Sequence, residues 1–217
     1  MDSSTRPARE SVSIADLGLI VYLGAVWGAA FLFFRVVSPE LGPVWTAELR
    51  VAIGGFALLL ATRRTLAAAV RGRVRDIAIV GATFSAIPFT LLAFATLTLP
   101  ASLASVLMAT TPLFTAMIGA FWLRQALVPS VLVGLGIGFG AVVLLVGGAP
   151  LELTPAAIAA FGAGLGAAFS YGVAGTFVKR RMTGMRPADL ATGQLLAAAV
   201  MLLPIALISS PLRLPSP

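Results

Sequence analysis

Three charged side chains lie within apolar stretches of the sequence: Arg35, Glu48 and Arg50. A charge near the centre of a bilayer costs roughly 3 kcal/mol or more, so such residues are usually paired or functional. One interpretation is an outward-facing vestibule, in which Arg50 attracts carboxylate or phosphate groups and an ion pair joins Arg35 to Glu48. The alternative is structural: Arg35 reaches the membrane interface, and Glu48 closes an ion pair near a helix N-terminus.

Two aromatic residues and one amide also fall well inside apolar stretches. Trp27 and Tyr171 are expected to line a central cavity, although most aromatics at such depth belong to a core or face lipid. Gln194 can both donate and accept hydrogen bonds, so it could bind a substrate without the cost of a charge. Its alternative role is to hydrogen-bond between helices.

The stretch Thr110-Thr111-Pro112 places a proline midway along another apolar run. Proline leaves a carbonyl of the preceding turn without its N–H donor, and a threonine hydroxyl or a substrate can then bind that carbonyl. Transporters often bind substrates at such interruptions. Pro88 and Pro204 create similar breaks. A simple packing kink remains the alternative at each position.

Catalysis has little support in the residue types. The chain has no His and no Cys, which removes Ser-His and His-metal sites as well as disulfide and thiol chemistry. No pair of aspartates lies at mid-membrane depth, so an aspartyl mechanism is not expected either. We therefore predict no enzyme activity, no catalytic residue, no metal site and no cofactor.

The elements that must position these side chains are membrane-spanning helices. Hydrophobic residues make up 59% of the chain and charged residues only 11%, whereas a soluble domain has about 25% charged residues. A span needs about 20 apolar residues, and lipid offers the backbone no hydrogen-bond partner, which favours helices. The sequence predicts an all-α integral membrane protein with seven transmembrane helices, at residues 17–37, 44–62, 77–97, 101–123, 128–146, 156–178 and 188–208.

The cations show how these helices are oriented. Lys and Arg occur in the N-terminal tail (1–16) and in alternate loops, while the other loops carry only Glu40 and Glu152. Because cytoplasmic loops are enriched in Lys and Arg, the N-terminus is predicted to be cytoplasmic and the protein to lie in the cytoplasmic membrane. The cations behind the net charge of +7 lie mainly between the apolar stretches, so the lipid bilayer is the expected partner and no nucleic-acid partner is expected.

An internal repeat sets the architecture. Residues 17–61 align without a gap on residues 161–205 at an offset of 144, which places Gly28 on Gly172 and Trp27 on Tyr171. Five spans separate the two copies, and an odd number inverts the second copy in the membrane, as in many secondary transporters. We expect one five-helix repeat at 17–148, the first two helices of a second repeat at 155–210, and a tail at 211–217.

Three stretches resemble EamA-domain proteins of the drug/metabolite transporter superfamily: AVWG at 25–28, ELR at 48–50, and ASLASVLMATTPLFTAMIGAFWLRQALVPSVLVGLGIGFGAVVLLVGG at 101–148. The resemblance implies ten helices in two inverted five-helix repeats, and export or facilitated movement of small metabolites, amino acids or drugs. Arg124-Gln125 stands where the family usually has Gly-Glu.

Two functions are therefore weighed. The first is a transporter of this type that moves a small-molecule substrate by export or exchange. The second is a truncated, non-transporting membrane protein, or a subunit that needs a homodimer or a complementing chain to complete the fold. A transporter binds a small solute, whereas a relic binds none.

Overall fold

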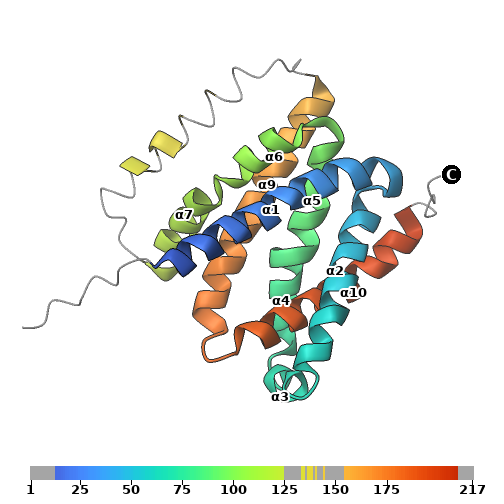
Figure 1. The fold of residues 1–217 in the computed structure, drawn as a ribbon, viewed down its shortest axis with the longest axis vertical. Coiled ribbons are helices and arrows are strands. Elements are labelled where there is room, and N and C mark those ends of the chain that lie inside the picture. Colours follow the sequence, from blue (N-terminus) through green and yellow to red (C-terminus); the bar gives the residue numbers. More distant parts are fainter. Residues whose placement is uncertain are drawn as a thin grey trace, which may run out of the picture.

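The computed structural model describes residues 13–124 and 154–209, together with residues 133, 134, 136–138, 140 and 144. Within these residues every regular element is a helix (Figure 1). In chain order they are α1 (Ile14–Leu41), α2 (Pro43–Thr62), α3 (Leu66–Val70), α4 (Val74–Gly81), the π-helical η1 (Ala82–Ala86), α5 (Ile87–Thr98), α6 (Ala101–Met108), α7 (Thr111–Leu123), α9 (Pro155–Arg181) and α10 (Pro187–Ser209).

Six helical segments in the described parts of the chain are long and apolar enough to cross a membrane. They confirm a multi-pass membrane protein and correspond to six of the seven expected spans. The remaining expected span, 128–146, lies largely outside the described residues. The segments are Ile14–Leu41, Pro43–Thr62, Val74–Thr98, Ala101–Trp122, Pro155–Arg181 and Pro187–Ser209.

The first helix is longer than the sequence suggested at both ends. At its start the Ser13 hydroxyl accepts a hydrogen bond from the Asp16 N–H at 3.1 Å, and the Asp16 carboxylate accepts from the Ser13 N–H at 2.9 Å, which is a capping box. At its end the helix continues through Pro39, where a separator was expected. Gly42 ends it instead, since its φ of 78° suits glycine.

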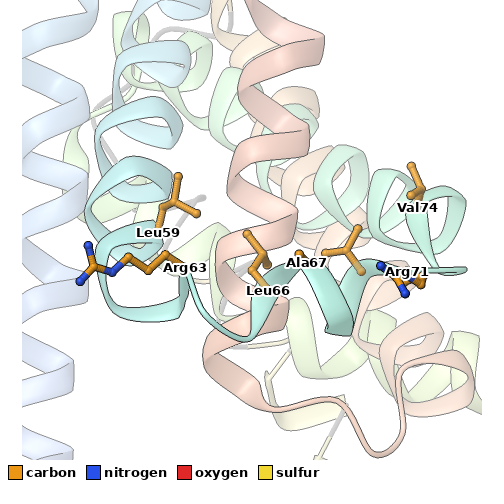
Figure 2. A pocket seen from close by; sticks show the side chains of 7 residues that line it. Leu59, Arg63, Leu66, Ala67, Arg71 and Val74 are labelled. Carbon is orange, nitrogen blue, oxygen red and sulfur yellow. The ribbon is translucent and has the colours of Figure 1, made fainter.

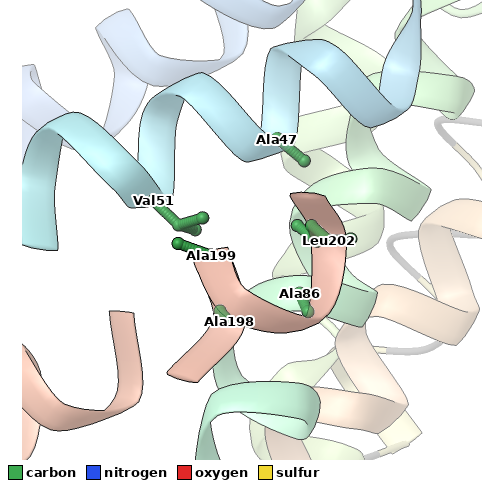
Figure 3. Packing of buried hydrophobic residues seen from close by; sticks show 6 residues of the cluster. All are labelled: Ala47, Val51, Ala86, Ala198, Ala199 and Leu202. Atoms are coloured by element: carbon green, nitrogen blue, oxygen red, sulfur yellow. The ribbon is translucent and has the colours of Figure 1, made fainter. Parts of the chain in front are cut away.

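The contact between α2 and α10 is built from small residues. Ala47 and Val51 of α2 face Ala198, Ala199 and Leu202 of α10, and Ala86 of η1 completes the cluster (Figure 3). Small side chains let helix backbones approach closely, which is how membrane helices gain packing energy.

Hydrogen bonds join the same two helices at the other end of α2. The hydroxyl groups of Thr62 and Thr192 lie 3.0 Å apart, and the Thr65 hydroxyl donates to Asp189 at 2.6 Å. Asp189 is buried. The C-terminal end of α2 therefore meets the N-terminal end of α10, so the two helices run antiparallel.

A second group of packed helices surrounds α9, which contacts α5, α6 and α7. Leu99, Leu103 and Leu107 pack against Ala160 and Ala163 of α9. Further along α9, Ala167 belongs to a cluster with residues of α1 and α5. The α9 helix is thus central among the described helices, and it carries one predicted site residue, Tyr171.

Candidate functional site

Arg50 of α2 lies against two aromatic rings from different helices. Its Cζ atom is 5.0 Å from the centroid of the Phe34 ring of α1 and 4.7 Å from that of the Phe89 ring of α5. Each such cation–π contact contributes about 0.5–2 kcal/mol, depending on how far it is removed from water. The rings hold the guanidinium group in place and leave its positive charge uncompensated.

No carboxylate neutralises this charge in the described residues. The single ion pair found there, within 4.0 Å, joins Arg186 to Asp189 at 3.9 Å. The Tyr171 hydroxyl of α9 lies within electrostatic range of Arg50, and the Tyr171 ring packs edge-on against Phe84 with centroids 5.1 Å apart. The N–H donors of Arg50 thus remain available for an anionic group.

The predicted ion pair between Arg35 and Glu48 is not formed. Arg35 Nη1 instead donates to the carbonyls of Thr96 at 2.6 Å and Leu97 at 3.0 Å. These carbonyls are in the last turn of α5, where they have no intrahelical partner and carry the negative end of the helix dipole. Arg35 therefore satisfies a helix terminus.

Glu48 lies elsewhere on α2. It is three residues before Val51 and seven before Gly55, so all three lie along the stripe of α2 that packs against α10. The side chain is 5% exposed, and its Oε2 atom has no hydrogen-bond partner in the described part of the chain. Glu48 is thus a buried carboxyl group without the cation expected for it.

The Thr110-Thr111-Pro112 stretch does interrupt its helix, as expected. α6 ends at Met108 and α7 begins at Thr111. Pro112 cannot donate to the Met108 carbonyl, and the Thr111 hydroxyl donates to it at 2.7 Å. The Thr110 hydroxyl donates to the Leu107 carbonyl at 2.6 Å. Threonine hydroxyls therefore occupy carbonyls at this break.

Met108 is the last residue of α6 before the break. This residue packs against the cluster that contains both Phe34 and Phe89. The structure thus brings two of the predicted features, Arg50 and Tyr171, into one neighbourhood of α1, α2, α5 and α9. The end of α6 that precedes the Thr-Pro break reaches the cluster that contains Phe34.

The π-helical segment η1, just before Pro88, is a further helix break, and Ser170, which the sequence did not indicate, contacts it. In η1 the Ile87 N–H donates to the Ala82 carbonyl, five residues back. The next donor in this pattern would be Pro88, which has no N–H, so the Thr83 carbonyl is left open. Ser170 of α9 donates to that carbonyl at 2.7 Å. Ser170 precedes Tyr171, and its hydrogen bond joins α9 to η1 next to Tyr171.

Two predicted residues lie apart from this neighbourhood. Trp27 was expected to line a central cavity, but it is 69% exposed on α1 and does not reach the interior of the described structure, so that prediction is wrong. Gln194 is half-buried on α10, and its carbonyl lies only 2.7 Å from the position that a Cβ of Gly81 would take. It therefore belongs to the contact between α10 and α4.

The rings of Phe34 and Phe89 are site residues that the sequence reading missed. Their signal is weak, because Phe is common along this chain and neither ring has a special spacing. As for metals, the described residues contain no group of three or more His, Cys, Asp or Glu side chains that could hold an ion.

Comparison with known proteins identifies one relationship. The family model described as the EamA-like transporter family matches residues 16–147, which is more than half of the chain. The comparisons with curated proteins and with solved structures gave no significant match.

Proposed function

We propose that this chain, which belongs to the EamA-like transporter family, moves small solutes bearing an anionic group across the cytoplasmic membrane by export or exchange. Metabolites, amino acids and acidic drugs are the substrate classes that meet this description. One observation carries the proposal: Arg50, inside a membrane span, has no acidic partner in the described residues.

Burial in an apolar setting makes this guanidinium a strong anion ligand. An interaction between unit charges is several-fold stronger near a protein than in bulk water. Arg also binds carboxylates and phosphates through paired N–H donors. The Phe34 and Phe89 rings cover the guanidinium without competing for these donors, and the Tyr171 hydroxyl provides a second polar group nearby.

An inverted two-repeat arrangement fits the packing. α2 and α10 correspond to each other under the offset of 144 residues. They run antiparallel and pack against each other (Figure 1), which is how counterparts in an inverted repeat meet at the repeat interface. We propose that residues 17–148 form the first repeat and residues 155–210 part of the second, with the N-terminus in the cytoplasm.

The test is transport by the purified chain in proteoliposomes. Exchange of radiolabelled solutes is measured for a panel with one, two or no negative charges. We expect Arg50→Ala to lower exchange of the anionic solutes at least about tenfold, which is the loss of one charge-assisted hydrogen bond. Arg35→Ala is the matched control, because it removes the same charge from another helix, and near-normal exchange is expected.

Two outcomes would contradict the proposal. Equal, near-normal exchange in the Arg50→Ala and Arg35→Ala variants would show that Arg50 does not bind the anionic solute. Transport of cations in preference to anions would show that the positive charge of Arg50 does not select the substrate. Arg50→Lys serves as a second variant, and it should retain part of the activity because it keeps the charge but loses the planar donor pair.

A further inference from the structure

A groove opens where the chain leaves α2 and turns through α3 into α4 (Figure 2). Its volume is about 550 Å³. Leu59 of α2, Leu66 and Val70 of α3, and Val74 of α4 contribute apolar side chains to it. Arg63 and Arg71 line it as well, directly after the ends of α2 and α3.

The position of the groove places it at a membrane surface. The span Pro43–Thr62 ends immediately before Arg63, and the span Val74–Thr98 begins immediately after the connection. The apolar lining is therefore at the depth where acyl chains begin, while the arginines are at the depth of lipid headgroups. A ligand that fits both parts must be amphipathic and negatively charged.

The two arginines are available for such a ligand. Both are exposed, and neither has a carboxylate within 4.0 Å in the described residues. Arg73, in the same connection, differs from them, since it donates to the Thr183 carbonyl at 3.4 Å. Arg64, in the same connection, and Arg75, in the first turn of α4, do not line the groove.

We infer that this groove is a binding site for an anionic phospholipid of the surrounding leaflet. Arg63 and Arg71 lie at opposite ends of the groove (Figure 2) and attract the lipid phosphate from its two sides, while one acyl chain covers the apolar side chains of α3. Basic pockets at the ends of membrane helices recognise anionic headgroups in this way. A general attraction of basic loops to the membrane would involve every arginine near this surface, whereas this site involves only the arginines that line the groove.

The test counts lipids bound to the full chain by native mass spectrometry in detergent, titrated with phosphatidylglycerol or phosphatidylcholine. We expect one phosphatidylglycerol to bind more tightly than phosphatidylcholine. The double variant Arg63→Gln/Arg71→Gln should weaken its binding about 25-fold, since each arginine near an anionic surface contributes about fivefold. The matched control, Arg64→Gln/Arg75→Gln, removes equal charge outside the groove and should leave binding within about twofold of the wild type.

Four results would overturn the inference. The first is an equal loss in both double variants, which would show non-specific attraction. The second is equal binding of phosphatidylcholine. The third is saturable binding of glycerol 3-phosphate with the same dependence on Arg63 and Arg71, which would show a site for a free phosphate. Arg63→Lys/Arg71→Lys keeps both charges, and failure of this variant to bind phosphatidylglycerol while remaining folded would also count against the site.

Discussion

The helices α1 and α9 correspond to each other in the sequence, yet their surroundings differ. Of the most apolar 18-residue window in each helix, 6% is buried in α1 and 44% in α9. The same alignment positions therefore have different neighbours: Trp27 is 69% exposed, whereas Tyr171 is half-buried against Phe84. Two stretches that align with each other thus both form a helix, and the packing around each helix decides which side chains reach the interior.

The glycine that follows each aromatic residue shows the difference most directly. A Cβ placed on Gly28 would meet no atom within 4 Å. A Cβ placed on Gly172 would lie 3.0 Å from the Phe114 Cβ and 3.0 Å from the Thr115 nitrogen, because α7 crosses α9 there. One glycine permits a close helix crossing, and its counterpart has no such constraint in the described structure.

The largest expected difference in stability is between leucine substitutions at these two positions. Gly172→Leu should force α7 away from α9 and lower the free energy of unfolding by about 3 kcal/mol, the upper range for overpacking a core. Gly28→Leu should leave it unchanged or raise it by up to about 1 kcal/mol, because leucine is the better helix former. Unfolding of the purified protein in detergent, titrated with SDS, measures both.

Equal destabilisation by the two substitutions would contradict the comparison. It would show that the described neighbours of α1 do not account for its packing. Gly172→Ala is a graded control, since one methyl group requires α7 to move only a few tenths of an ångström.

The aromatic pair should differ in transport by about 1 kcal/mol. Tyr171→Phe removes the hydroxyl group near Arg50 and should raise the KM for anionic solutes up to about tenfold, as expected for one hydrogen bond to a charged group. Trp27→Phe should leave the KM unchanged, since Trp27 faces outward. Exchange kinetics in proteoliposomes measure the KM for each variant. A larger effect at Trp27 than at Tyr171 would reverse the assignment of α9 as the helix that faces the substrate.

The sequence was sufficient for the six spans in the described residues and for the Thr-Pro break, because hydropathy and proline chemistry act over a few neighbouring residues. It was not sufficient for partners across helices. The sequence predicted an ion pair between Arg35 and Glu48, but Arg35 caps α5, and Glu48 is buried on α2 in line with Val51, which packs against α10. Which face of α2 meets which helix depends on the rotation of α2 about its axis, and an apolar pattern with hydrophobic residues all round does not fix that rotation.

Ser170 offers a smaller test of the same contrast. Ser170→Ala leaves the Thr83 carbonyl without its donor and should lower the free energy of unfolding by about 1 kcal/mol. Its counterpart in α1 is Val26, which is 47% exposed, and Val26→Ala should change that free energy by less than about 0.5 kcal/mol. The same SDS titration applies. A loss at Val26 as large as that at Ser170 would mean that α1 is packed as closely as α9.

The smallest effect is expected at Glu48 and Thr192, which occupy corresponding positions in α2 and α10. Thr192→Val removes the hydroxyl contact with Thr62 and should lower the free energy of unfolding by about 0.6 kcal/mol, the average for a hydrogen bond between membrane helices. The loss is small because the Thr62 hydroxyl can still donate to the Leu58 carbonyl. Glu48→Gln keeps the shape of the side chain but removes the option of a buried charge, so the same free energy should rise or stay constant. The reason is that an uncompensated charge is costly in an apolar interior. If Glu48→Gln lowered the free energy of unfolding as much as Thr192→Val does, Glu48 would have a stabilising partner. The contrast between the two ends of the α2–α10 contact would then be wrong.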